Sequence, residues 1–473
     1  MTVKKATIIA VYLGFALAAV YGIPYLNQVM SVASAFYAKT LCSGVFVAGR
    51  APRDVIAQDV LADMSAGLRR WKGEVDREHN IAAASLFGLA ERRALYRPGL
   101  GCTLMTQTSA DALLRQVRNY SPSPAPARST ALWPEGSAVE LSRSIEGVDT
   151  QKLTTALKEA FAEPDQDTKR RTRALIVVHK GRIIAERYAP GFGPDTPQPG
   201  WSMGKSVLNA LIGTLVESGR LKLRSNRLFA PWRGQGDPRG AITVDDLLRM
   251  VSGLDFDAPH TRMLSDVRKM LFLKRDGAAY AASEQLAVPV GSSWFYASGS
   301  TMLLARAMGE AIAGSQARYF SYPHKALFGP LGMSSAVLEP DAAGTFAAPA
   351  FIFASARDWA RLGLLYLNDG KWGGKQILPK GWVRTSLKPA PHSGGQYGAH
   401  LWLKIPDFLR PEPAAAHALP EDAFFMLGYD GQMVAIIPSA QLVVVRLGLS
   451  RRRDAWDHEA FLNALLQAFG TEG

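Results

Sequence analysis

The segment Gly200–Lys205 contains the side chains of this sequence that best fit a catalytic site. Ser202 is followed three positions later by Lys205. Positions three apart on a helix lie on the same face, so the Lys205 ammonium can reach the Ser202 hydroxyl. Serine is a weak nucleophile until a neighbour takes its proton, and lysine can do so when burial and nearby positive charge lower its pKa. The spacing therefore predicts a serine nucleophile with a lysine base.

Two serine motifs overlap at Ser202, and the flanking sequence distinguishes between them. Gly-x-Ser-x-Gly forms a nucleophile elbow only when a buried strand runs directly into the serine. Residues 190–200 are rich in proline and glycine, which a central strand excludes. Residues 202–218 carry apolar side chains at helical spacing. A helix that begins at the serine favours the Ser-x-x-Lys motif, with the elbow as the alternative, and leaves the Ser202 N–H free to stabilise an oxyanion.

Tyr296 and Ser298 form a second group of candidate residues in a downstream Tyr-x-Ser pattern. A phenol near Lys205 can act as a proton shuttle, accepting from Ser202 and later delivering to the leaving group. The structural alternative is a buried tyrosine in an aromatic cluster. Ser298 can bridge Lys205 and the substrate, or it can be a solvated or helix-capping serine.

The ordered set of these motifs indicates a protein family more specifically than any single motif does. With Thr243–Leu254 and Pro330–Met333 added, residues 165–450 resemble the serine β-lactamase and penicillin-binding-protein superfamily, in particular its class C-like esterases. The run Ser355–Gly363 is similar to 6-aminohexanoate-oligomer hydrolases. The resemblance implies an α+β fold: an antiparallel sheet of five or more strands flanked by helices, beside an all-helical subdomain. It implies that Ser202 lies at their junction.

The third motif of that superfamily, Lys-Thr-Gly, is altered here. The matching stretch is Met426–Gln432. In one register Gly428 replaces the motif glycine and the Tyr429 N–H is the second oxyanion donor. In the other register the Gln432 N–H takes that role. Neither contains the lysine that pairs with the carboxylate of β-lactams, so the resemblance implies an esterase or amidase for uncharged or oligomeric acyl substrates rather than a β-lactamase.

The strand pattern agrees with a sheet assembled from both ends of the domain. β-branched runs at Ala174–Val178 and Arg182–Tyr188 predict a hairpin. A second strand pair is predicted at Met433–Ile437 and Leu442–Leu447, followed by a helix over about 455–469. The segments between them have helical periodicity at Val244–Met250, Ser300–Ile312 and Ser355–Leu367.

The N-terminus predicts export of the protein. Ala6–Leu26 is almost continuously apolar and follows Lys4 and Lys5. That length can cross a bilayer, and the lysines favour a cytoplasmic N-terminus. Residues 1–38 are therefore predicted to be an inner-membrane anchor that leaves the catalytic domain in the periplasm. A signal peptide cleaved near Ala33–Ala35 is the alternative.

The remaining boundaries follow from composition. Residues 39–120 are predicted to form a small module with helices at Ala51–Ser65 and Ser109–Asn119 and loops between them. Residues 121–135 are predicted to be a Pro-rich linker. Residues 136–473 are predicted to be the hydrolase domain. The two cysteines, Cys42 and Cys102, are predicted to form a disulfide in the oxidising compartment, with two buried thiols as the alternative.

Composition excludes some classes of function. The 473 residues are 48% hydrophobic and 20% charged, which is typical of a globular protein. The net charge of +13 comes from scattered residues without a nucleic-acid-binding motif, so no nucleic-acid partner is expected. No metal-ligand spacing is present, and no cofactor is predicted. An inactive envelope binding protein with the same fold is the remaining alternative.

Overall fold

The computed structural model describes residues 18–62, 71–122, 129–141, 144–165, 168–256, 262–411 and 418–470. Residues 1–17 of the expected membrane segment and residues 123–128 of the expected linker lie outside these ranges.

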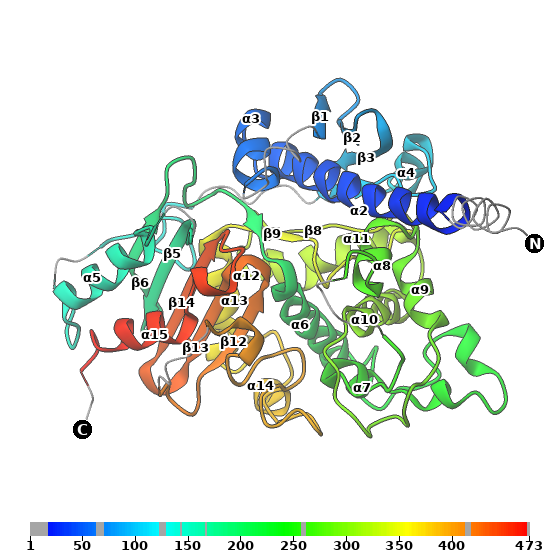
Figure 1. The fold of residues 1–473 in the computed structure, drawn as a ribbon. Coiled ribbons are helices and arrows are strands. Elements are labelled where there is room, and N and C mark those ends of the chain that lie inside the picture. The colour runs from blue at the N-terminus through cyan, green and yellow to red at the C-terminus, as the bar shows by residue number, and fades with distance from the viewer. Residues whose placement is uncertain are drawn as a thin grey trace, which may run out of the picture.

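A five-stranded antiparallel sheet forms one side of the main domain, the one predicted above to be the hydrolase domain, with the strand order β12-β13-β14-β5-β6 (Figure 1). Its strands are β5 (Thr172–His179), β6 (Arg182–Tyr188), β12 (Phe424–Gly428), β13 (Gln432–Ile437) and β14 (Leu442–Gly448). The pairing of β5 with β14 joins the first and last parts of the domain. The predicted α+β fold, with a sheet assembled from both ends of the domain, is confirmed.

Alternate residues of each strand point to opposite faces of this sheet. Helices cover both faces. On one face Ile176 and Val443 pack in the same core as helix α13 (Ala356–Leu367). On the other face Leu175 and Val444 pack with helices α5 (Thr150–Phe161) and α15 (His458–Leu466). The sheet is therefore buried on both faces.

Gly363 lets α13 approach the sheet closely. A Cβ built on Gly363 would lie 2.4 Å from Val443 Cγ1 and 3.0 Å from Val434 Cγ1. We expect Gly363→Ala to lower the free energy of unfolding by about 1–3 kcal/mol through overpacking, measured by chemical denaturation. Gly234→Ala is the control, because nothing lies within 4 Å of its Cβ position, and it should be neutral or stabilise by up to about 1 kcal/mol. An equal effect of both changes would contradict the packing argument.

The second half of the hydrolase domain is mainly helical and lies beside the sheet, with α6 between the two parts (Figure 1). Its helices are α6 (Gly204–Glu217), α7 (Val244–Arg249), α8 (Asp266–Phe272), α9 (Gly277–Ser283), α10 (Ser298–Ile312), α11 (Gln316–Pro323) and α12 (Gly329–Leu331). The remaining short elements are β7 (Gln198–Pro199), β8 (Val337–Leu338), β9 (Ile352–Ala354), β10 (Lys371–Trp372), β11 (Lys375–Gln376) and α14 (Trp382–Ser386).

The N-terminal module is organised differently from the prediction. Its long helix α2 (Ile23–Cys42) packs against a four-stranded sheet where loops were expected. The strands are β1 (Trp71–Asp76), β2 (Ile81–Leu86), β3 (Leu89–Arg97) and β4 (Gly101–Leu104). The expected helices are shorter: α3 (Pro52–Val55), continued by a π-helical turn to Val60, and α4 (Ala110–Gln116).

The module lies on the hydrolase domain, with α2 running across it (Figure 1). The predicted disulfide is present between Cys42 at the end of α2 and Cys102 in β4. Glu339 of the hydrolase domain forms an ion pair with Lys39, and both side chains are at most 4% exposed. Glu339 also accepts hydrogen bonds from the Ser43 hydroxyl at 2.9 Å and the Cys102 N–H at 2.6 Å. One buried carboxylate thus joins the helix, the disulfide and the domain.

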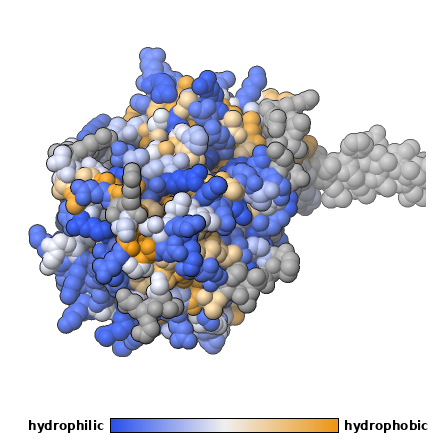
Figure 2. Space-filling view, turned by 90° about the vertical axis from the view of Figure 1, so that its left-hand side faces the viewer, coloured by the Kyte–Doolittle hydropathy of each residue, from blue (hydrophilic) through white to orange (hydrophobic). Residues whose placement is uncertain are grey.

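The helical stretch Val20–Val47 is long and apolar enough to cross a membrane. Its beginning is exposed, with Val20, Tyr21, Ile23, Tyr25 and Leu26 between 56% and 69% accessible. Residues from Ser31 onward are largely buried against the folded body. The surface shown in Figure 2, by contrast, is mainly hydrophilic, with small separate hydrophobic patches. The cleavage site of the alternative interpretation, at Ala33–Ala35, lies inside α2, with Ser34 and Ala35 fully buried.

Candidate active site

Ser202 lies in a single 3₁₀ turn, Trp201–Met203, that leads directly into α6. Lys205 is in the first turn of α6, and its Nζ lies 3.1 Å from Ser202 Oγ. The turn is held by the Gly200 N–H, which donates to the Ile352 carbonyl at 2.8 Å. The two-residue β7 before Ser202 belongs to a small antiparallel sheet with β9, so no buried parallel strand runs into the serine. The nucleophile-elbow alternative is therefore wrong.

Lys205 is buried in an environment that favours its neutral form. Its side chain is 1% exposed, and no carboxylate pairs with it in the part of the chain that the structure describes. Burial lowers the pKa of Lys205 to about 7. Besides Ser202, its Nζ lies 3.5 Å from Ser298 Oγ and 3.5 Å from the Pro349 carbonyl oxygen. A lysine with this pKa exchanges protons near neutral pH.

Tyr296 lies directly against this pair. Lys205 Nζ is 4.7 Å from the centre of the Tyr296 ring. Burial raises the pKa of Tyr296 to about 12, although hydrogen bonds with Ser202 and Trp402 act in the opposite direction. The ring also packs against Tyr397 and Trp402, so it belongs both to an aromatic cluster and to the surroundings of Ser202.

The segment before Tyr296 is attached to the end of α7. The Phe295 N–H donates to the Met250 carbonyl at 3.0 Å. α7 itself begins with a capping box, in which Thr243 Oγ1 accepts from the Asp246 N–H and the Asp246 carboxylate accepts from the Thr243 N–H. This cap explains the local role of the Thr243–Leu254 motif. Ser298, the first residue of α10, is 9% exposed, and the N-cap position belongs to Ala297.

The end of β12 lies against the turn that carries Ser202. A Cβ at Gly428 would be 2.3 Å from the Gly200 carbonyl oxygen, so only glycine allows this approach. The next residue, Tyr429, is 56% exposed, and its ring meets that of Trp201 edge to face at 5.8 Å. Gln432 is 1% exposed in β13, and its side chain binds the Gly448 backbone. This arrangement is compatible with the register that uses Tyr429.

His400 contacts the site through the backbone of Lys205. Its Nδ1 lies 3.1 Å from the Lys205 carbonyl oxygen and its Nε2 3.3 Å from Thr301 Oγ1. Burial, together with the Lys205 charge, lowers the pKa of His400 to about 3. The ring therefore stays neutral and contacts the backbone of the lysine rather than the serine. Within the described ranges, no group of three or more His, Cys, Asp or Glu residues could hold a metal ion.

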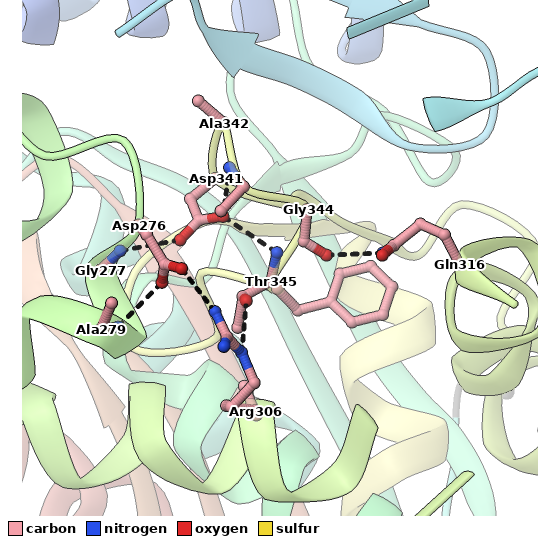
Figure 3. Close-up of polar contacts among 12 residues, drawn as sticks. Asp276, Gly277, Ala279, Arg306, Gln316, Asp341, Ala342, Gly344 and Thr345 are labelled. Atoms are coloured by element: carbon pink, nitrogen blue, oxygen red, sulfur yellow. Dashed lines mark hydrogen bonds and ion pairs between the residues drawn. The ribbon is translucent and has the colours of Figure 1, made fainter. Parts of the chain in front are cut away.

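The loop between β8 and β9 contributes both Pro349 and Glu339. Polar contacts around Asp341 and Thr345 shape this loop (Figure 3). The carboxylate of Asp341 accepts from three backbone N–H groups, those of Gly277, Ala343 and Thr345, at 2.9–3.0 Å. Burial raises the pKa of Asp341 to about 7. Arg306 of α10 binds Asp276 at 2.6 Å and Thr345 Oγ1 at 3.3 Å. The loop is thereby tied to the helical subdomain next to the site.

Several contacts of the site were not predicted from the sequence. The Pro349 carbonyl lies 3.5 Å from both Ser202 Oγ and Lys205 Nζ. Phe36 of α2 stacks on Trp201, with ring centres 6.3 Å apart and an interplanar angle of 7°. A backbone carbonyl carries no sequence signal. Phe36 lies in the segment that was assigned to the membrane anchor.

Comparisons with known proteins agree with this architecture. A 6-aminohexanoate-dimer hydrolase from Paenarthrobacter ureafaciens is 26% identical over 226 residues, which make up 46% of this chain. The chain spans 57% of the length of that relative.

Two solved structures share the fold. A candidate 6-aminohexanoate-dimer hydrolase from Bacillus anthracis has a TM-score of 0.53 at 23% identity, over 70% of this chain and 86% of that one. A candidate beta-lactamase from Bacteroides dorei DSM 17855 has a TM-score of 0.54 at 16% identity, over 68% of this chain and 99% of that one. The family model described as Beta-lactamase matches residues 157–466, most of the chain. The chain therefore belongs to the Beta-lactamase family of hydrolases.

Proposed function

We propose that this protein is a serine esterase or amidase that forms a covalent acyl-enzyme on Ser202. The observation that carries the proposal is the 3.1 Å separation of Lys205 Nζ from Ser202 Oγ, combined with the pKa of about 7 for Lys205. A neutral amine at that distance is positioned to accept the hydroxyl proton. Fold and family alone do not assign these roles, because one fold supports many activities.

In the proposed reaction Lys205 takes the proton from Ser202 as Oγ bonds to the substrate carbonyl carbon. The carbonyl electron pair moves to its oxygen and forms a tetrahedral oxyanion. The proton then passes to the leaving oxygen or nitrogen, with Tyr296 as the shuttle, as the bond to the leaving group breaks. Water repeats the sequence on the acyl-serine and releases the acid.

The proposed oxyanion donors are the backbone N–H groups of Ser202 and Tyr429. Ser202 is in the first turn before α6, where N–H groups lack helical acceptors. Tyr429 follows Gly428, whose close approach to the Gly200 carbonyl brings the end of β12 to the same turn. Two such donors stabilise charge only as it develops in the transition state.

The proposed substrate class is a small or oligomeric ester or amide. The segment Met426–Gln432 contains no lysine to pair with a β-lactam carboxylate. One relative is named a 6-aminohexanoate-dimer hydrolase, and an acyclic amide of that kind fits the same chemistry. We therefore expect turnover of linear esters and amides before that of β-lactams.

We further propose that α2 keeps the enzyme at a membrane, with the hydrolase domain in the periplasm. The exposed apolar residues from Val20 to Leu26 form the part of the helix that lies outside the folded body. Cleavage near Ala33–Ala35 would divide a helix whose second half is buried in the module. The uncleaved anchor is therefore preferred.

Labelling with a fluorophosphonate probe tests the proposed nucleophile. We expect the full-length protein to gain one covalent phosphonate on Ser202, located by mass spectrometry of its peptides, because an activated serine attacks the probe. Ser202→Ala should not label, whereas Ser218→Ala at the far end of α6 should label as the wild type does. Folded wild-type protein that does not label would favour the alternative of an inactive envelope binding protein.

A further inference from the structure

The N-terminal module contacts both chain segments that carry the proposed oxyanion donors. On one side Phe36 of α2 stacks on Trp201, the residue before the proposed nucleophile, with an interplanar angle of 7°. On the other side the guanidinium of Arg451, which follows β14, donates to two backbone carbonyl oxygens of the module, those of Asp59 and Ala62. The module therefore reaches the surroundings of the active site from two directions.

Arg451 also lies beside the turn Tyr429–Gly431, which follows β12. The preceding residue, Ser450, donates its backbone N–H to the Asp430 carbonyl at 2.9 Å. Burial raises the pKa of Asp430 to about 6, and the Arg451 charge acts against that shift. Burial also raises the pKa of Tyr429, and the same charge again opposes the rise. Arg451 is thus placed between the module and the turn that begins with Tyr429.

Two residues of these segments adopt backbone conformations that residues other than glycine rarely take. Trp201 has a φ of +49° and Asp430 a φ of +61°. Such conformations persist where the surrounding structure holds them. Trp201 lies directly before Ser202, and Asp430 lies directly after Tyr429, so each strained residue is adjacent to a proposed oxyanion donor. The placement of the two donor N–H groups therefore depends on the contacts that hold Trp201 and Asp430.

The hydrolase domain supplies part of these contacts. Gln432 Nε2 donates to the Tyr429 carbonyl at 3.1 Å, and Arg446 Nη1 donates to the Asp430 carbonyl at 3.2 Å. Both donor side chains are at most 1% exposed. The Tyr429 side chain, by contrast, is 56% exposed, and its ring meets that of Trp201, which the module contacts in turn. The domain thus fixes the carbonyl groups of the turn, and the module is joined to its exposed part.

We propose that the N-terminal module positions the oxyanion-binding groups of the active site, with Arg451 and Phe36 as the positioning residues. The inference rests on the proposed acyl-enzyme mechanism, and it gives the module a role in the reaction besides anchoring. Arg451 connects the module to the turn of Tyr429, and Phe36 fixes Trp201 beside Ser202. Each acts through the backbone of a neighbouring residue. Because a misplacement of about 1 Å can cost about 10²-fold in rate, loss of either contact lowers turnover.

Steady-state hydrolysis of p-nitrophenyl acetate by the full-length protein tests the contact made by Arg451. Arg451→Met removes the donors to the module, and we expect kcat/KM to fall about 10–100-fold, because oxyanion contacts act in the transition state. Arg451→Lys keeps the charge and a single donor group, and it should recover part of the loss. Arg452→Met is the matched control at the next position, where the exposed side chain pairs with Asp454, and it should leave kcat/KM unchanged.

Inhibition by hexyl trifluoromethyl ketone separates positioning from folding. The Ser202 oxygen adds to the ketone carbon, the hydroxyl proton passes to Lys205, and the carbonyl oxygen becomes an oxyanion held by the same donors. The inhibition constant does not depend on the fraction of enzyme that is folded. We therefore expect it to rise in Arg451→Met by the same factor by which kcat/KM falls, and to stay unchanged in Arg452→Met.

Phe36→Leu tests the second contact independently, because it removes the ring that stacks on Trp201. We expect kcat/KM to fall and the inhibition constant to rise, as in the Arg451 variant. Phe46→Leu is the matched control, since the Phe46 ring stacks on Tyr96 within the module, with ring centres 5.3 Å apart, and it should change neither constant.

The wild-type protein distinguishes failure of this inference from failure of the proposed function. Wild-type values of kcat/KM and of the inhibition constant in both Arg451→Met and Phe36→Leu would overturn the inference and leave Ser202 as the nucleophile. A wild-type protein that hydrolyses no ester and forms no covalent adduct on Ser202 would overturn the proposed function, and this inference would fall with it.

Discussion

Replacement of Lys205 by methionine is expected to lower kcat/KM for activated esters by about 10²–10⁴-fold, the usual contribution of a general base. The reason is local: Lys205 Nζ is 3.1 Å from Ser202 Oγ, and within the described chain no histidine or carboxylate forms a hydrogen bond with that oxygen. Methionine has a similar volume but cannot accept a proton. Steady-state hydrolysis of p-nitrophenyl acetate measures the loss.

The same substitution should stabilise the protein at pH 6, which separates lost catalysis from lost folding. Burial lowers the pKa of Lys205 from 10.5 to about 7. Below pH 7 the lysine is charged in both the folded and unfolded states, and the folded state bears the cost of a buried charge. Between pH 7 and 10.5 the unfolded state binds the extra proton, so that cost disappears as the pH rises. A thermal midpoint equal to or above that of the wild type is therefore expected for Lys205→Met.

The pH profile provides the second readout of the same prediction. Since Lys205 must be neutral to accept a proton, kcat/KM should rise tenfold per pH unit up to about pH 7 and then level off. Lys205→Arg keeps the charge at every accessible pH and should be as inactive as Lys205→Met. A flat profile in the wild type between pH 5 and 8, or substantial activity in the arginine variant, would remove Lys205 from the mechanism.

Glu339→Gln is expected to lower the free energy of unfolding by about 3–5 kcal/mol, because it leaves the buried Lys39 ammonium without its counter-charge. Glu339 is fully buried and accepts from Lys39, the Ser43 hydroxyl and the Cys102 N–H. Burial lowers the pKa of Lys39, and the Glu339 carboxylate opposes that shift. Chemical denaturation of the full-length protein, followed by circular dichroism, measures the change.

Two further variants identify the cause of that loss. Glu310→Gln removes an ion pair with Arg233 whose side chains are 44% and 58% exposed, and it should cost at most about 1 kcal/mol. The double variant Lys39→Met/Glu339→Gln removes both charges and should recover part of the stability. If the double variant is as unstable as Glu339→Gln, the unpaired ammonium is not the cause. In that case the hydrogen bonds to Ser43 and Cys102 would account for the loss.

Much of the hydrolase domain follows from local sequence pattern. The strands predicted at Ala174–Val178 and Arg182–Tyr188 correspond to β5 and β6, because β-branched runs bounded by turn residues suit a sheet buried on both faces. The helix predicted from Ser202 is present as a 3₁₀ turn followed by α6. Its apolar face packs in the core of the domain, so periodicity alone located it.

The N-terminal module was predicted poorly for a physical reason. β2 has the sequence Ile-Ala-Ala-Ala-Ser-Leu, and alanine has low strand propensity, so local pattern does not indicate a strand there. The sheet forms because α2 covers it: a Cβ at Gly73 in β1 would lie 2.5 Å from Tyr37 of α2. An apolar helix that covers a sheet and one that enters a bilayer share the same composition, so the sequence did not separate these two roles within α2.

The sequence by itself identified the candidate reactive residues: a serine and a lysine separated by one helical turn, a tyrosine downstream, and a glycine where a strand must come close. These depend on contacts between near neighbours, which local spacing encodes. Only the tertiary structure decided the state of those residues. The neutral form of Lys205 depends on burial by segments distant in the chain, including the Pro349 loop. The contact of Phe36 with Trp201 depends on a module held by Glu339, hundreds of positions away. Because burial of a side chain and docking of the module depend on many contacts between residues far apart in the sequence, no local sequence pattern predicts them.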